Sequence, residues 1–289
     1  MAKKAVIIGI NDYAPIGAGG PDLNGCIADA RDMANTLVIC GFQPTNIRIL
    51  TNQNATKNNI ITYIKWLLTG NKAGDSLVLY YSGHGTRVAN IGTDLELDGL
   101  DEAVCPHDYA TAGVIRDDEF KNLFKGKVRK GVSFDVFFDC CHSGSGTRKM
   151  NLSGIDGMFA NETPRFIPPM LEDEFYFNFS KSIETKSSTK EASSEEATTT
   201  TKSLNKVPEM NHVLWAGCMD NQVSMEGDFS GMTRGYFTYN LCKVLRATSG
   251  NITRELLDSQ IANALSAMGA AQINQTEGKS AKLKLKIFE

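Results

Sequence analysis

The sequence predicts an α/β protein built on a mainly parallel sheet of about six strands, with helices on both faces. Short apolar runs rich in β-branched residues alternate along the chain with longer stretches of helical period, which is the pattern of such folds. The 289 residues are 42% hydrophobic and 22% charged, so the chain can bury a sizeable core as a globular protein.

The predicted elements follow one another without internal repeats. The expected strands are Lys4 to Ile10, Asn46 to Leu50, Ser76 to Ser82, Val132 to Asp139, His212 to Gly217 and Leu283 to Phe288. Helical periodicity predicts helices over Cys26 to Ile39, Thr56 to Leu68, Asp117 to Leu123, Tyr236 to Leu245 and Thr253 to Met268. Gly41 follows the first helix, where a left-handed cap is expected.

Charge and cysteine content argue against several classes of protein. The net charge is −3, with Lys and Arg scattered rather than striped, so no nucleic-acid partner is expected. The apolar stretch in MAKKAVIIGIND is too short for a signal peptide, and no run is long enough to span a membrane. The seven cysteines lack paired zinc spacings, so we expect free thiols in a reducing cytoplasm. Nothing demands a dimer, and we expect a monomer.

The composition changes abruptly from Ser180 to Ser203, where Ser, Thr, Glu and Lys replace almost all apolar residues. Such a segment cannot bury enough surface to offset its ordering entropy, so we expect a flexible excursion. Strand-like segments resume after it and complete the sheet. The chain is therefore expected to form one domain, with a large portion at 1–179, a linker at 180–205 and a small portion at 206–289.

Two motifs carry residues suited to chemistry. YYSGHGT, Tyr80 to Thr86, and FFDCCHSGSG, Phe137 to Gly146, each follow an apolar strand. Ligands bind at the carboxyl ends of parallel strands, so the two motifs are expected to meet there. An imidazole within reach of a thiol lowers the pKa of the thiol and can protonate a leaving amine. The glycines allow backbone N–H groups to approach a substrate, as an oxyanion hole requires.

Each residue also has an ordinary structural interpretation. A lone His after a strand is often structural, and a buried Cys is usually an inert small hydrophobe. The adjacent residues Cys140, Cys141 and His142 point to opposite faces of an extended chain, so they would bind one metal ion poorly. A redox pair of Cys140 and Cys141 would form a strained disulfide. The two motifs together favour catalysis over these alternatives.

The motif pair YSGHGT and DCCHSGS resembles that of metacaspases and their prokaryotic relatives, the caspase-like cysteine peptidases or orthocaspases. The resemblance covers nearly the whole chain except the Ser/Thr-rich segment, and it implies a caspase-like three-layer sandwich with large- and small-subunit-like portions. It also implies a cysteine endopeptidase that needs no organic cofactor. The nucleophile is then Cys141 rather than Cys140, the catalytic His is His84, and the backbone N–H groups of Gly85 and Cys141 form the oxyanion hole.

The resemblance further implies a specificity pocket formed by Cys26, Asp29, Ser82 and Asp139, and Asp220 could contact a residue beside the cleaved bond. Two carboxylates facing one narrow pocket repel each other unless a cation joins them, so Asp29 and Asp139 predict substrates with Arg or Lys. The alternative for Asp29 is a solvated helix carboxylate near Arg31. A second reading of the whole protein is a catalytically silent module that binds basic peptide segments.

Acidic residues at Asp101, Asp117 and Asp118 would suit a hard cation such as Ca²⁺ if they converge, and the resemblance implies calcium at these positions. Asp117 and Asp118 would equally favour the dipole of the helix that they begin. The position where the family has a further aspartate is Arg148, which leaves calcium dependence open. We also expect self-cleavage after a linker lysine (Lys181, Lys186, Lys190 or Lys202) or after Arg148 or Lys149.

Overall fold

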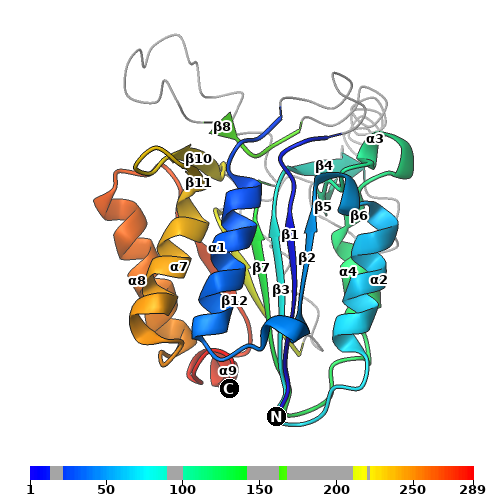
Figure 1. The fold of residues 1–289 in the computed structure, drawn as a ribbon, viewed down its shortest axis with the longest axis vertical. Helices are drawn as coiled ribbons and strands as arrows, with labels where there is room; N and C mark the ends of the chain where they lie inside the picture. Colours follow the sequence, from blue (N-terminus) through cyan, green and yellow to red (C-terminus); the bar gives the residue numbers. More distant parts are fainter. Residues whose placement is uncertain (14–21, 90–99, 142–162, 168–210, 220–221) are drawn as a thin grey trace, which may run out of the picture.

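A six-stranded sheet forms the centre of the protein, in the order β12-β9-β7-β3-β1-β2 (Figure 1). The structure is a computed structural model that describes residues 1–13, 22–89, 100–141, 163–167, 211–219 and 222–289. The strands of this sheet are β1 (Lys3–Gly9), β2 (Ile47–Thr51), β3 (Ser76–Ser82), β7 (Ser133–Asp139), β9 (Val213–Ala216) and β12 (Gln275–Glu277). Every neighbouring pair is parallel except β12 and β9, which are antiparallel. The predicted fold class is therefore confirmed.

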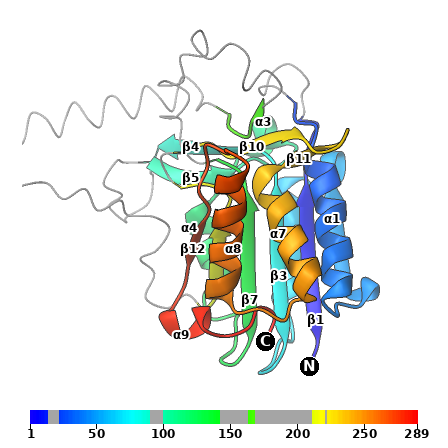
Figure 2. The same cartoon turned by 90° about the vertical axis from the view of Figure 1, so that its left-hand side faces the viewer.

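Helices cover both faces of this sheet, because alternate side chains of each strand point to opposite sides. On one face, α1 (Cys26–Ile39), α7 (Tyr236–Thr248) and α8 (Arg254–Ala267) bury Met33, Leu241 and Ile261 against Ile7 and Tyr80. On the other face, α2 (Lys57–Leu68) and α4 (Asp117–Phe124) pack on side chains of the opposite set of strand positions. Figures 1 and 2 show the two helical layers on either side of the sheet.

The five predicted helices match the structure closely, because their start signals are local. Thr56 and Thr253 act as N-caps of α2 and α8, and their side chains accept hydrogen bonds from the N–H groups of Asn59 and Leu256, both at 3.3 Å. Gly41 follows α1 with a φ of +89°, as predicted for a left-handed cap. In the described residues, no helix is both long enough and apolar enough to span a membrane.

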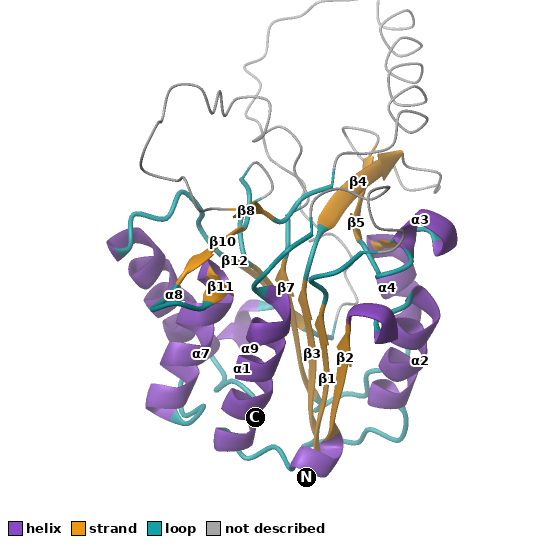
Figure 3. Cartoon of the chain, turned by 45° about the horizontal axis from the view of Figure 1, so that its top comes forward, coloured by secondary structure: helices purple, strands orange, loops and turns teal. Residues whose placement is uncertain are grey.

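Two small three-stranded sheets lie beyond the carboxyl ends of β1, β3 and β7 (Figures 1 and 3). One consists of β4 (Gly85–Ala89), β5 (Leu100–Val104) and β6 (Ile115–Arg116); the other consists of β8 (Thr163–Pro164), β10 (Met225–Asp228) and β11 (Thr233–Gly235). The short helix α3 (Tyr109–Ala112) lies near the first of these. These strands have two to five residues, which is too short for their periodicity to be recognised in the sequence.

The predicted strand from Leu283 to Phe288 is wrong. The segment instead includes the end of helix α9 (Ser280–Leu283) and a single bridge between Lys286 and Thr253. The burial does not follow the alternating pattern of the sequence: Ile287 and Phe288 are both buried in the core, while Leu285 is exposed. The sixth strand is the polar β12, which lies at the edge of the sheet and carries no alternating apolar signal.

His212, just before β9, makes the fold sensitive to acid. Its ring packs on Phe124 and Phe134 at centroid distances of 5.1 and 5.7 Å, and burial, reinforced by Lys282, lowers the pKa of His212 to about 4. In the unfolded chain the pKa is near 6.5, so as pH falls from about 6.5 to about 4 only the unfolded chain gains this proton. At pH 5 the folded state should lose about 2 kcal/mol relative to pH 8 from this group alone.

The variant His212→Phe keeps a ring in this aromatic environment and removes the proton site. Urea unfolding at pH 5 and pH 8 should show a smaller loss of stability for the variant than for the wild type. If both proteins lose the same free energy of unfolding, His212 does not control acid sensitivity.

Candidate active site

The two sequence motifs meet at the carboxyl ends of β3 and β7. These strands are parallel neighbours, and their last residues, Ser82 and Asp139, lie opposite each other. His84 and Cys141 each follow two residues later, and both are fully buried. Cys140 belongs to the core cluster between the sheet and helices α2 and α4, whereas Cys141 lies in a separate small cluster with Phe166 and Val223. The adjacent cysteines therefore lie in different environments.

Two tyrosines hold the backbone of His84. The N–H of His84 donates a hydrogen bond to the hydroxyl of Tyr13 at 2.6 Å, and the hydroxyl of Tyr81 donates to the carbonyl of His84 at 2.7 Å. The ring of Tyr13 lies 4.9 Å from the imidazole of His84, measured between centroids. Burial raises the pKa of both tyrosines, so they remain neutral hydrogen-bonding groups. No pattern in the sequence marks Tyr13, which lies far from both motifs along the chain.

Ser224, another residue that the sequence did not single out, contacts the thiol of Cys141. The backbone N–H of Ser224 donates to Sγ of Cys141 at 2.7 Å, and the thiol lies 3.2 Å from the Ser224 carbonyl oxygen. The segment before β10 thus fixes the position of the sulfur through its main chain. Main-chain contacts do not depend on the side chain, so no residue type marks this role in a sequence.

The backbone N–H groups of Gly85 and Cys141 point at one acceptor. They donate to the carbonyl oxygen of Arg165 at 3.0 and 3.1 Å, which is the geometry of an oxyanion hole around a carbonyl oxygen. Glycine is required at position 85, because a Cβ there would lie 1.9 Å from the carbonyl oxygen of Cys141. The sequence predicted both donors but not the residue that they meet.

The side chain of Arg165 fills a closed acidic pocket. Its guanidinium is fully buried, with one nitrogen 2.9 Å from Asp139 and the other 2.7 Å from Asp29 and 3.3 Å from Glu226. It also donates to the hydroxyl of Ser82 at 2.9 Å. Asp29, Ser82 and Asp139, predicted as pocket residues, therefore lie around one cation.

The carboxylates of the pocket are held by further donors. Asp139 accepts hydrogen bonds from the hydroxyls of Ser224 and Thr238, both at 2.6 Å. Asp29 accepts from the backbone N–H of Gly235 at 3.0 Å, and a Cβ at Gly235 would lie 2.2 Å from Asp139. The pocket is thus rigid and has room for an unbranched cationic side chain.

Glu226 was missed by sequence reasoning. It follows Asp220, which we expected to contact a residue beside the cleaved bond, and β10 carries it into the pocket. Its carboxylate accepts the N–H groups of Asn24 and Gly25 at 2.7 and 3.0 Å, so it is held at the start of α1. Glu226 is only 1% exposed, which is unusual for a glutamate and indicates a role in the pocket. No pattern in the sequence predicts this burial.

The two remaining predicted pocket residues are Cys26, which the structure describes, and Asp220, which it does not. Cys26 begins α1 and is fully buried. Burial raises the pKa of its thiol above the ordinary value, Arg165 lowers it, and Glu226 and Asp29 raise it further. Asp220 lies outside the described residues.

The surroundings of Asp29 in the pocket shift its pKa. Burial and, to a lesser extent, Asp139 raise the pKa of Asp29 to about 6, although Arg165 lowers it. Three buried carboxylates face one guanidinium, so the pocket has more acidic groups than a single cation can neutralise. A bound cation is therefore what keeps these groups ionised together.

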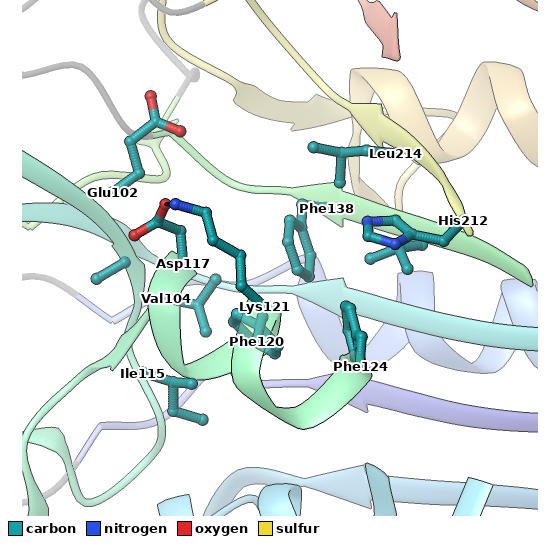
Figure 4. Close-up of a pocket in the computed structure, with 12 residues that line it drawn as sticks. Glu102, Val104, Ile115, Asp117, Phe120, Lys121, Phe124, Phe138, His212 and Leu214 are labelled. Atoms are coloured by element: carbon teal, nitrogen blue, oxygen red, sulfur yellow. Dashed lines mark ion pairs between the residues drawn. The ribbon is translucent and has the colours of Figure 1, made fainter. Parts of the chain in front are cut away.

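Of the acidic residues predicted for calcium, Asp117 lines a different cavity, of about 30 Å³, near the start of α4 (Figure 4). Lys121 lies 2.7 Å from Asp117 and 2.8 Å from Asp118, and Arg116 lies 2.9 Å from Asp101. Burial raises the pKa of Asp101, and Asp117 and Asp118 raise it further. As arranged, no three acidic, His or Cys side chains in the described part of the chain converge on a metal position. Arg148 lies outside that part.

The order of the sheet, with His84 and Cys141 beyond adjacent parallel strands, defines a protein of the caspase-like fold class. The crystal structure of protein GSU0716 from Geobacter sulfurreducens is similar over 100% of this chain and 98% of that chain, with a TM-score of 0.68 and 27% identity. The metacaspase, peptidase C14 domain, matches residues 3–148. The chain therefore belongs to the metacaspase family, as its motifs predicted.

Curated relatives carry the same family name. Metacaspase-1 from Arabidopsis thaliana is 40% identical over 150 residues, which cover 50% of this chain and 40% of that protein. Metacaspase-1A from Aspergillus fumigatus is 30% identical over 274 residues, which cover 89% of this chain and 64% of that protein. The chain thus spans about two fifths to two thirds of the length of the relatives that it matches.

Proposed function

We propose that this chain is a cysteine endopeptidase that hydrolyses peptide bonds after Arg or Lys, with Cys141 as the nucleophile and His84 as the proton carrier. The observation that carries the proposal is the position of Arg165. Its side chain is buried between carboxylates, while its carbonyl oxygen accepts two backbone N–H groups beside Cys141. Those contacts are the ones that a substrate residue on the acyl side of a cleaved bond requires.

The proposed mechanism assigns a task to each group. The sulfur of Cys141 adds to the substrate carbonyl, and the N–H groups of Gly85 and Cys141 stabilise the negative charge on its oxygen. His84 takes the thiol proton and delivers it to the leaving amine, and water then hydrolyses the thioester. Tyr13 and Tyr81 keep His84 in position through its backbone.

The pocket favours Arg over Lys and excludes Asp. The two terminal nitrogens of the Arg165 guanidinium contact different carboxylates, Asp139 on one side and Asp29 with Glu226 on the other. A single ammonium cannot satisfy both sides as fully, so Lys should be accepted less well. An Asp side chain would add a fourth carboxylate and should be rejected.

A catalytically silent module that binds basic segments is the second candidate, because the buried Arg165 is by itself a binding observation. Fluorogenic peptides that end in Thr-Pro-Arg, Thr-Pro-Lys or Thr-Pro-Asp, assayed with calcium or chelator, discriminate between the two. We expect turnover of the Arg peptide first and of the Lys peptide second. Turnover of only the Asp peptide would overturn the pocket assignment, and binding of the Arg peptide without turnover under all conditions would favour the silent module.

The pH dependence should report Asp29. Its pKa of about 6 applies with the Arg165 guanidinium in the pocket, and an empty pocket, which lacks this cation, holds the pKa of Asp29 higher. A substrate guanidinium must then displace a proton from Asp29, so the KM for the Arg peptide should fall as pH rises above about 6. In Asp29→Asn the KM should be higher and lose this component, and equal pH profiles of KM in both proteins would contradict the role of Asp29.

We further propose that calcium, if it activates the protein, competes with Lys121 and Arg116 for Asp101, Asp117 and Asp118. Lys121 already lies as a cation between two of the carboxylates, and Asp117 keeps a buried oxygen without a hydrogen-bond partner among the described residues. A calcium ion would bind the oxygens of these carboxylates and hold them together beside α4. Binding of calcium to the full chain, measured by calorimetry, should weaken in Asp117→Asn.

Self-cleavage belongs to the same proposal. The sites predicted from the sequence, four linker lysines together with Arg148 and Lys149, lie outside the described residues. Their cleavage stays a prediction.

A further inference from the structure

Residues 163–167 lie in the site as an extended strand between two others. On one side, β8 pairs antiparallel with β10, with Thr163 opposite Glu226 and Pro164 opposite Met225 (Figure 3). On the other side, Phe166 forms a parallel bridge to Gly85, the first residue of β4. Addition of a strand to exposed sheet edges is a common way of binding an extended peptide. This segment of the chain therefore lies where a peptide substrate would.

The main chain of the segment fixes which bond faces the thiol. The N–H of Arg165 donates to the Ser224 carbonyl at 3.1 Å, and the Arg165 carbonyl accepts the N–H groups of Gly85 and Cys141. Two residues further along the chain, the N–H of Ile167 donates to the Gly85 carbonyl at 3.0 Å. The carbonyl held in the oxyanion hole thus belongs to the bond between Arg165 and Phe166.

The side chains on either side of this bond agree with the main chain. Arg165 is buried between the three carboxylates, and Phe166 packs with Cys141 and Val223 in a small apolar cluster. Burial of an ion pair is weak evidence for stability, because desolvation offsets much of the attraction. A structural role for the Arg165 side chain does not explain why the carbonyl oxygen of the same residue accepts two converging N–H groups. Side-chain and main-chain contacts instead describe a bound substrate.

We infer that the Arg165–Phe166 bond is the built-in substrate of this chain: the intact segment blocks the groove, and the chain opens it by cutting this bond. The inference rests on the proposed function. Sγ of Cys141 bonds to the Arg165 carbonyl carbon, and the C–N bond then breaks as the nitrogen of Phe166 receives the thiol proton through His84. A water molecule hydrolyses the thioester, which leaves a carboxylate on Arg165 and returns the proton to the thiol.

This site differs from those predicted from the sequence. The linker lysines were chosen because a flexible segment is easily cut. Arg165, in contrast, is already seated, so its cleavage occurs within one molecule and does not depend on protein concentration. The intact chain should therefore hydrolyse added peptides only after a lag, while the cut segment leaves the pocket.

The test follows purified full-length chain over time by intact-mass spectrometry, with calcium present and at several protein concentrations. We expect fragments 1–165 and 166–289 to form with a first-order rate that is independent of concentration, and no fragments from Cys141→Ala. Hydrolysis of the Thr-Pro-Arg peptide by the same samples should show a lag of matching length. Cleavage at other bonds while the 165–166 bond stays intact, or a rate of 165–166 cleavage proportional to concentration, would overturn the inference.

Two variants separate this inference from the proposed function. Arg165→Lys keeps the cation in the pocket and should be cut at the same bond, more slowly, whereas Arg165→Gln should remain uncut there and show no lag. If wild-type chain hydrolyses the Arg peptide at once while its own 165–166 bond stays intact, the built-in substrate is wrong and the peptidase proposal stands. If neither the peptide nor the chain is cut by any variant, the peptidase proposal itself fails.

Discussion

Replacing Cys141 with alanine should abolish hydrolysis of the Arg peptide, with a loss of kcat/KM on the order of 10⁴-fold or more. The reason is that Cys141 is the group that forms the acyl intermediate in the proposed mechanism. The N–H groups of the oxyanion hole belong to the backbone and remain, so any residual rate measures their contribution alone. Initial rates at pH 7.5 with calcium present measure the loss, compared with and without Cys141→Ala in an Arg165→Gln background, where the pocket is open without cleavage.

Cys140→Ala is the matched control, since it removes the same atoms one residue away. Cys140 lies in the core cluster under the sheet, and burial raises the pKa of its thiol well above the ordinary value. Its loss should cost about 1 kcal/mol of stability and leave the rate of peptide hydrolysis nearly unchanged. A larger loss of rate in Cys140→Ala than in Cys141→Ala would reverse the choice of nucleophile.

The main elements could be predicted from the sequence because their signals are local. β3 and β7 are apolar throughout, and α2 and α8 begin at threonines whose hydroxyls cap the first turn. The prediction for the terminal segment from Leu283 failed because an alternating apolar pattern does not show whether a partner strand is available. The edge of the sheet is taken by β12 instead, and Leu285, an apolar position of the pattern, is exposed.

Site residues that act through their side chains and lie in the motifs could be predicted from the sequence. Residues that act through the main chain, or that reach the site from distant segments, could not. Asp29 and Asp139 are placed by the ends of α1 and β7, so their motifs located them. Glu226 enters the pocket only because β10 pairs with β8 and β11, an arrangement of two- to four-residue strands. Ser224 acts through its backbone, and Arg165 through a conformation that depends on both small sheets.

Among the pocket carboxylates, Asp139 should have the largest effect on catalysis. It is the carboxylate that contacts the first guanidinium nitrogen of Arg165, whereas Asp29 and Glu226 share the second. When one partner of that shared pair is lost, the other remains. Asp139→Asn should therefore lower kcat/KM for the Arg peptide by about 2–5 kcal/mol, or roughly 30- to 5,000-fold, mainly through KM. Glu226→Gln should cost about tenfold or less.

Asp32→Asn provides the control for changes of charge near α1. Asp32 lies on the same helix as Asp29 but pairs with Arg246 at 2.6 Å and with Arg234 at 3.3 Å, away from the pocket. Its loss should change kcat/KM little, as expected for a partly exposed ion pair. Thermal unfolding of all three variants separates loss of the pocket from loss of the fold. Equal effects of Asp139→Asn and Asp32→Asn in folded protein would mean that general charge attraction, rather than the pocket, selects the substrate.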